Sequence, residues 1–167
     1  KRQVLFLILL ILLLDQVLKI YIKTHFELNT SHKIFGDWFQ LFFVENPGMA
    51  YGLKFGGTTG KVLLTVFRMA AVIFGAFYII KIIRKKEHPG FILCTALIFA
   101  GAMGNLIDSC FYGIFFDKGM LYNAALQDYT HYYDGLAKFT IKQGYASFLH
   151  GNVVDMLYFP ILKGHFP

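Results

Sequence analysis

Residues 4–22 read VLFLILLILLLDQVLKIYI, an apolar run in which Asp15 and Lys19 are the only charged residues. A helix needs about 20 apolar residues to cross the hydrocarbon core of a membrane. A secretory signal peptide would have a shorter apolar core and a small-residue cleavage site, which this stretch lacks. Two further apolar stretches lie at residues 62–83 and 90–107. The sequence therefore predicts a mainly α-helical membrane protein with three visible spans.

The composition also indicates a membrane protein. Hydrophobic residues make up 56% of the 167 residues and charged residues 16%, whereas typical soluble domains have about 45–50% and 25%. The net charge of +6 could suggest a nucleic-acid partner. However, the densest basic run, at residues 84–86, closes an apolar stretch as a cytoplasmic flank does. Lys1 and Arg2 flank the first span in the same way, so we expect residues 23–61, and all residues after Asp108, to face outside.

These outer segments differ in character. Residues 23–61 contain WFQLFFV at 38–44, followed by the turn signal Asn46-Pro47-Gly48, and are expected to form a loop with a small sheet. Residues 109–150 hold eleven Phe or Tyr and read as an inserted outer segment. They could form an aromatic belt at the membrane interface or a folded lid over a site in the membrane. Residues 151–167 are expected to start a return to the membrane.

Several charged and polar residues lie inside the predicted spans, where they are functional candidates by default. Asp15 and Lys19 are four apart on one helical face and can form a pair, which could also serve only to lock helices together. Arg68 lies near the outward end of its span and could snorkel or bind an anionic lipid group. Asn105 and Asp108 share a face at the outward end of the third span.

The predicted orientation brings Asp15, Asp108 and Asp155 to the outer side of the membrane. Converging carboxylates have different pKa values, so one can act as a general base and another as a general acid. This is aspartyl-protease chemistry, which requires neither a metal nor a cofactor. The six histidines show no metal-ligand spacing. Sequence position and chemistry alone favour Asp108 and Asp155 as the pair of catalytic carboxylates.

Four motifs together resemble the bacterial lipoprotein signal peptidase (signal peptidase II) family. They are DQVLK at 15–19, NPGMAYG at 46–52, GAMGNLID at 101–108 and VVD at 153–155. The resemblance implies a multi-pass aspartyl endopeptidase of the bacterial inner membrane that removes signal peptides from diacylglyceryl-modified prolipoproteins. It implies an active site near the outer leaflet, four transmembrane helices and a small outer sheet.

The resemblance also assigns roles. Asp155 is the catalytic carboxylate of the Val-Val-Asp motif, and its partner is an Asp of an Asn-x-Ala-Asp motif on a fourth helix. No such motif follows Asp155, so the fourth helix is expected beyond the end of the chain. Asp108 then becomes a supporting residue. From the resemblance and the span charges together, the supporting or substrate-binding candidates are Asp15, Lys19, Asn46, Gly48, Arg68, Gly104, Asn105, Asp108 and Asn152.

Two departures from the family pattern stand out. Ser109 follows Asp108 where the family usually has Arg, and the distance from Asp108 to Asp155 is much longer than usual. The implied partners are a lipid-modified prolipoprotein, membrane phospholipid and cyclic-peptide inhibitors, with no nucleic acid and no cofactor. Two alternatives stay open. One is an ion or proton transport subunit, and the other is a non-catalytic membrane scaffold if the fourth helix is absent.

Overall fold

The computed structural model describes residues 2–48, 57–130 and 135–160. It contains the helices α1 (Arg2–His25), α2 (Gly57–Arg84) and α3 (Pro89–Ile107). A π-helical turn, η2 (Asp108–Tyr112), and the short α4 (Gly113–Phe115) continue α3 without a break, which gives a helix of 27 residues. All three long helices have the length and apolar composition needed to cross a membrane. The predicted fold class, apolar helices with a small sheet, is confirmed.

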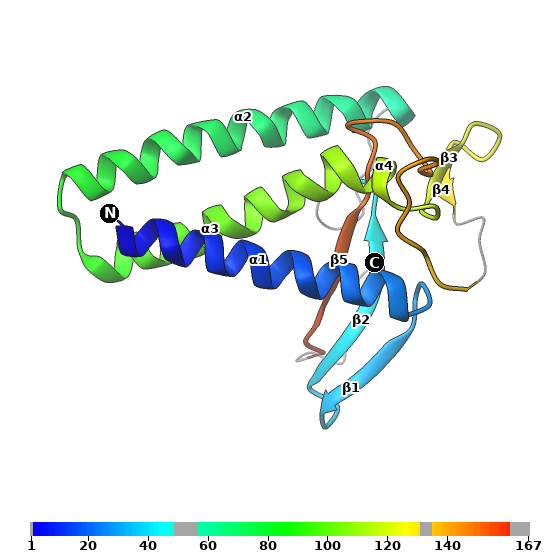
Figure 1. The fold of residues 1–167 in the computed structure, drawn as a ribbon, viewed down its shortest axis with the longest axis horizontal. Coiled ribbons are helices and arrows are strands. Elements are labelled where there is room, and N and C mark those ends of the chain that lie inside the picture. Colours follow the sequence, from blue (N-terminus) through cyan, green and yellow to red (C-terminus); the bar gives the residue numbers. More distant parts are fainter. Residues whose placement is uncertain (1, 49–56, 131–134, 161–167) are drawn as a thin grey trace.

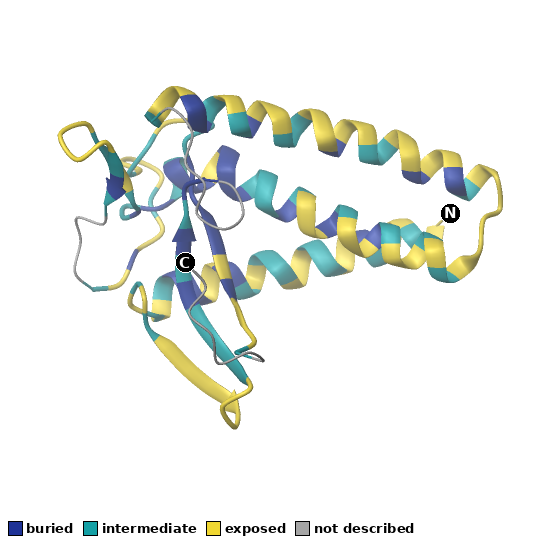
Figure 2. Ribbon diagram, turned by 180° about the vertical axis from the view of Figure 1, so that it is seen from behind, coloured by how far each residue is buried: buried dark blue, intermediate teal, exposed yellow. Residues whose placement is uncertain are grey.

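The three helices run along the long axis of the molecule, and α3 packs against both α1 and α2 (Figure 1). Their outward faces carry large exposed apolar side chains, such as Phe6, Phe74 and Ile98. One core of buried residues lies where the helices meet the sheet. A second core, of Ile8, Ile79, Ala96 and Ala100, lies between the three helices farther from the sheet (Figure 2). Exposed apolar faces of this extent suit helices surrounded by hydrocarbon.

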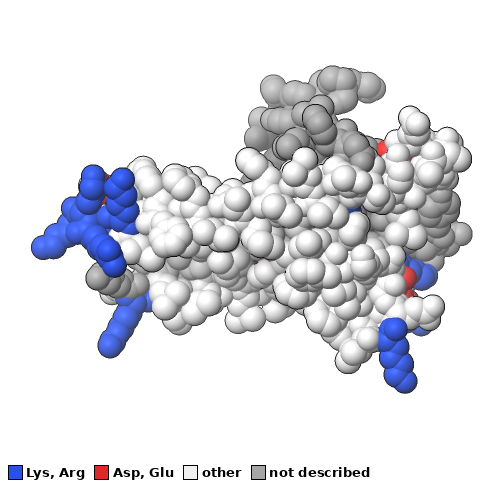
Figure 3. Space-filling view, turned by 90° about the horizontal axis from the view of Figure 1, so that it is seen from above, with Lys and Arg blue, Asp and Glu red and all other residues white. Residues whose placement is uncertain are grey.

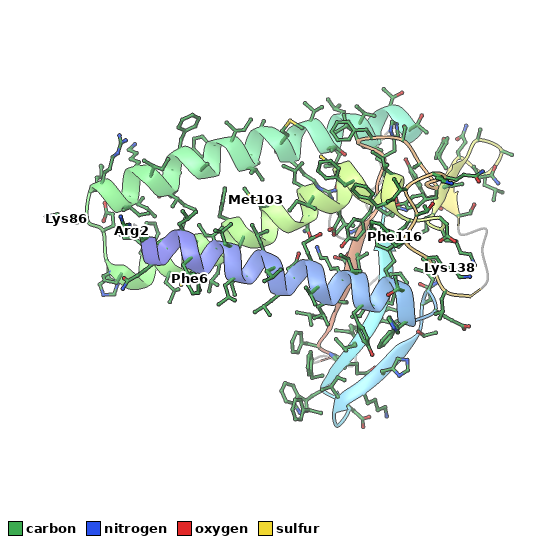
Figure 4. The ribbon with its side chains drawn as sticks, viewed as in Figure 1. Arg2, Phe6, Lys86, Met103, Phe116 and Lys138 are labelled. Atoms are coloured by element: carbon green, nitrogen blue, oxygen red, sulfur yellow. The ribbon has the colours of Figure 1, made fainter. Side chains whose placement is uncertain are left out.

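The exposed charged residues lie toward the two ends of the molecule. On the face shown in Figure 3, most Lys and Arg side chains gather at one end, a few lie near the other end, and most of the surface between them is uncharged. Arg2 and Lys86 lie at this end, whereas Phe116 and Lys138 lie at the other (Figure 4). The sheet and the inserted segment are therefore at the end opposite the basic flanks.

The sheet has three antiparallel strands in the order β1 (Ser31–Phe35), β2 (Phe39–Asn46) and β5 (Val153–Tyr158). Val44 lies opposite Asp155, and Asn46 lies opposite Val153. Residues 153–158 were expected to begin the return to the membrane, but they extend this sheet. Val153 and Val154 are β-branched and buried, which favours a strand. Residues 161–167 lie outside the described part of the chain.

The inserted segment begins later than the predicted residue 109. Residues 109–115 belong to the helix, because aromatic side chains such as Phe111 and Phe115 extend its apolar character. The segment then forms a hairpin of β3 (Leu121–Asn123) and β4 (Asp128–Thr130). Its buried side chains join one core with α1, β2 and β5. That core contains Ile22, Phe43, Tyr112, Phe116, Ala137, Val154 and Met156.

Candidate active site

A buried ion cluster joins α1 to α3 just below the sheet. The Lys19 ammonium lies 2.7 Å from Asp108 Oδ2 and 3.3 Å from Asp15 Oδ2, and it donates to Asn105 Oδ1 at 2.9 Å. Helical spacing places Asp15 with Lys19 on one face of α1, and Asn105 with Asp108 on one face of α3. The predicted pairing of Asp15 with Lys19 is confirmed, although Asp108 is the nearer partner of Lys19.

Asp108 is engaged by hydrogen-bond donors on both of its oxygens. Gln16 Nε2 donates to Oδ1 at 3.0 Å, while Lys19 and the Val154 backbone N–H both contact Oδ2. The Asp108 side chain is 0% exposed, so no solvent reaches it in the folded chain. These contacts tie α1, α3 and β5 together at one carboxylate. A carboxylate used in this way is suited to support, not to proton exchange with a substrate.

Gly104 is required by this cluster. A Cβ at position 104 would collide with the Asp15 carboxylate, whereas a Cβ at Gly101 would meet nothing within 4 Å. The small residues in this stretch therefore have different roles. Gly104 lets the α1 carboxylate approach α3, and Gly101 faces open space.

Asp155 follows Val154 on β5, and its side chain is accessible. Successive side chains of a strand point to opposite faces, so Val154 is buried while Asp155 is exposed. Asn46 Nδ2 donates to Asp155 Oδ2 at 3.2 Å, and Asn46 Oδ1 accepts from the Gly48 N–H at 2.9 Å. Surrounding protein raises the pKa of Asp155 by desolvation, against the hydrogen bond from Asn46 and the charges of Lys19 and Arg68, which lower it.

Arg68 reaches this region from α2. Its Nη1 donates to Ser109 Oγ at 2.7 Å, and its Nη2 donates to the Gly48 carbonyl oxygen at 2.8 Å. Ser109 Oγ in turn donates to the Asn105 carbonyl oxygen at 2.8 Å. Ser109, which stands where the family usually has Arg, thus holds an arginine that comes from another helix.

Asn152 belongs to a different group of residues. Its Nδ2 donates to Glu45 Oε2 at 2.8 Å and to the Met120 carbonyl oxygen at 2.9 Å. Its Oδ1 accepts from Lys61, while Lys23 forms an ion pair with Glu45. We call Lys23, Glu45, Lys61 and Asn152 the outer polar cluster. Asn152 is a predicted site residue, and these contacts place it in the outer polar cluster.

Several residues that the structure brings into these groups were not predicted from the sequence. Gln16, which follows Asp15 in the DQVLK motif, bridges Asp15 and Asp108. Lys23 follows Lys19 by four residues on the same helical face, a spacing that could have revealed it. Glu45 is the one charged residue of β2. Within the described ranges, no three His, Cys, Asp or Glu side chains gather as metal ligands do.

Comparisons with known proteins agree with this arrangement. A family model described as signal peptidase (SPase) II matches residues 7–167. A lipoprotein signal peptidase of Porphyromonas gingivalis (strain ATCC 33277) is 43% identical over 162 residues, which are 96% of this chain and 65% of that protein. One from Amoebophilus asiaticus (strain 5a2) is 35% identical, covering 95% of this chain and 60% of that protein. The chain thus spans less than two thirds of these relatives.

One solved structure, described as a bacterial membrane enzyme, has a similar fold. The TM-score is 0.56 at 20% sequence identity, and the match covers 99% of this chain and 74% of that one. At this identity the likeness concerns the fold, which is a set of long apolar helices capped by a small sheet.

Proposed function

Since the chain belongs to the signal peptidase II family, we propose that it acts as an intramembrane aspartyl endopeptidase. Its substrate is a diacylglyceryl-modified prolipoprotein, and it cleaves the peptide bond before the modified cysteine. The proposed setting is a bacterial inner membrane, with the active site near the outer leaflet. The separation of the basic flanks from the sheet supports this orientation.

The contrast between Asp108 and Asp155 carries the proposal. Asp108 is buried and engaged by Lys19, Gln16 and Val154. Asp155, one residue beyond Val154, is accessible and hydrogen-bonded by Asn46. In this mechanism Asp155 takes a proton from a water molecule, whose oxygen attacks the scissile carbonyl carbon. A second carboxylic acid gives a proton to the leaving amine as the C–N bond breaks.

The second carboxyl group is also part of the proposal. Asp15 and Asp108 both contact Lys19, and their engagement makes neither a suitable acid. We propose instead an Asp of an Asn-x-Ala-Asp motif on a fourth helix, outside the 167 residues. The two carboxyl groups would share one proton, because neighbouring like charges disfavour simultaneous ionisation.

The remaining residues would bind substrate or hold the site rigid. Asn46 is oriented by the Gly48 N–H, so it can fix the direction of the Asp155 carboxyl. Arg68 links α2 to Ser109 and to the Gly48 carbonyl, which steadies the turn after β2. The ion cluster of Lys19, Asp15 and Asp108 anchors β5, and thereby Asp155, to the helices. Cyclic-peptide inhibitors and lipid partners follow from the family resemblance alone.

The alternatives are a transport subunit and a non-catalytic scaffold, and family membership favours neither. The deciding experiment uses the protein as its gene encodes it, purified in detergent. A prolipoprotein substrate is supplied with and without the diacylglyceryl group, and the masses of the products are measured by mass spectrometry. Cleavage before the cysteine in the modified substrate alone is the expected result. Cleavage of neither substrate would refute the proposed function.

A further inference from the structure

Lys61, on the first turns of α2, is a buried basic group that the proposed catalytic machinery does not use. It is 5% exposed, and it donates to Asn152 Oδ1. Its Nζ also lies 4.8 Å from the centre of the Tyr129 ring. In the part of the chain that the structure describes, no carboxylate lies within 4 Å of this ammonium group.

The outer polar cluster therefore holds two basic groups and one carboxylate. Lys23 and Lys61 are cations, and Glu45 is the carboxylate of the cluster. Glu45 is ion-paired with Lys23, and its Oε2 accepts from Asn152 and from the Met120 N–H. Burial disfavours the charged form of a basic group that has no carboxylate in direct contact. An anion beside Lys61 would stabilise its charged form.

A pocket of about 380 Å³ lies beside Lys61. It is formed between the start of α2, the β3–β4 hairpin and the chain that leads to β5. Hydroxyl groups and one imidazole line it together with the ammonium. Its polar lining residues include Thr58, Lys61, Tyr122, Ser147 and His150. Hydroxyl donors around a cation form the kind of environment that binds phosphate oxygens.

A second hollow lies next to this pocket along α2. Thr58 and His150 line both hollows, so the two are adjacent. The second one runs beside the apolar side chains of Val62, Leu63 and Val66. From Thr58 to Val66 the helix rises about 12 Å, toward its membrane-spanning part. A polar pocket beside an apolar groove matches a molecule with a phosphate head and a hydrocarbon tail.

We propose that this pocket and groove bind one phospholipid of the outer leaflet. Its phosphate contacts Lys61, and one acyl chain lies along Val62, Leu63 and Val66. The bound lipid neutralises the outer polar cluster and fastens the inserted segment to α2. Asp155 lines neither hollow, so this lipid site is separate from the proposed cleavage site and goes beyond the proposed function.

The test measures lipid binding and needs no protease activity. The delipidated protein is titrated in detergent with phosphatidylglycerol, with diacylglycerol and with inorganic phosphate, and bound molecules are counted by native mass spectrometry. We expect one tightly bound phosphatidylglycerol. Diacylglycerol should bind at least about tenfold more weakly, because it lacks the phosphate. Inorganic phosphate should not displace the lipid at equal concentration, because it gains nothing from the groove.

Three variants locate the site. Lys61→Met removes the charge and keeps the length of the side chain, and it should weaken phosphatidylglycerol binding at least about tenfold. Leu63→Asn changes an exposed groove residue without touching the outer polar cluster, so it tests the groove even if Lys61→Met folds poorly. Lys138→Met, on the exposed surface of the inserted segment, is the matched control and should bind like the parent protein.

Two results would overturn the proposal. One is phosphatidylglycerol binding that both Lys61→Met and Leu63→Asn leave unchanged. The other is inorganic phosphate binding that depends on Lys61 while Leu63→Asn has no effect on the lipid, since that pattern identifies a site for free anions. The lipid-binding assay does not depend on proteolytic activity. A failure of the lipid-site proposal is therefore distinguishable from a failure of the proposed function.

Discussion

Replacing Lys19 with Met tests how the buried ion cluster stabilises the fold. Met has nearly the length of Lys and packs in its place, so the substitution removes mainly the charge. Lys19 is 3% exposed and contacts both Asp15 and Asp108. Without Lys19, Asp108 keeps its hydrogen bonds from Gln16 and Val154, and no other cation of the described residues forms an ion pair with it.

The expected loss of stability is large. Removing one partner of a buried ion pair costs about 3–5 kcal/mol, because the other charge is left without compensation. Hydrogen bonds to charged groups contribute about 1.5–3 kcal/mol each, and Lys19 donates one to Asp108. For a chain of this size, that loss corresponds to a fall of roughly 6–20 °C in the midpoint of thermal unfolding.

The assay is thermal unfolding in detergent, followed by circular dichroism at equal protein concentration. The matched control is Lys33→Met, because Lys33 and Asp37 form another pair four residues apart, but both side chains are exposed. Solvent screens exposed pairs, so the control should shift the midpoint little. Adding Asp108→Asn to Lys19→Met should recover part of the loss. Equal midpoints for Lys19→Met and Lys33→Met would refute the account of the buried cluster.

Two further predictions concern Gly104, which contacts this cluster, and Asn46, which contacts Asp155. Gly104→Ala forces a Cβ against the Asp15 carboxylate and should destabilise the protein by about 1–3 kcal/mol. Gly101→Ala meets open space and should be neutral or stabilising, so equal unfolding midpoints would contradict this argument. Asn46→Ala removes a hydrogen bond that lowers the pKa of Asp155, so that pKa should rise. A base acts when ionised, so the acidic limb of kcat/KM should move to higher pH, and an unmoved limb would argue against Asn46 as the partner of Asp155.

Much of the fold could be predicted, because a long apolar stretch is a strong signal of a membrane-spanning helix. The runs at 4–22, 62–83 and 90–107 lie within α1, α2 and α3. The end of α3 could not be predicted, since Asp108 looks like a terminus in sequence. The structure places this carboxylate in a π-helical turn, where Lys19 compensates its charge and the helix continues. Likewise, residues 153–158 are too short to reveal whether they enter a membrane or a sheet.

The candidate site was predictable where local spacing decides the contact. Asp15 with Lys19, and Asn105 with Asp108, follow from helical periodicity. Contacts between distant segments left no such pattern. Arg68 with Ser109, and Lys61 with Asn152, join residues 41 and 91 positions apart in the chain. The strand register that brings Asn46 beside Asp155 also depends on tertiary pairing.

The central claim is that Asp155 is a catalytic carboxylate and Asp108 is not. The most direct measurement is the turnover of a diacylglyceryl-modified prolipoprotein by the Asp155→Asn variant of the protein as its gene encodes it, with Asp37→Asn as the exposed control. Asn keeps the shape of the side chain but cannot accept the proton, so turnover should fall about 10²–10⁴-fold. The amount of folded protein should be unchanged, because the Asp155 side chain is accessible. Near-normal turnover by Asp155→Asn would contradict the account.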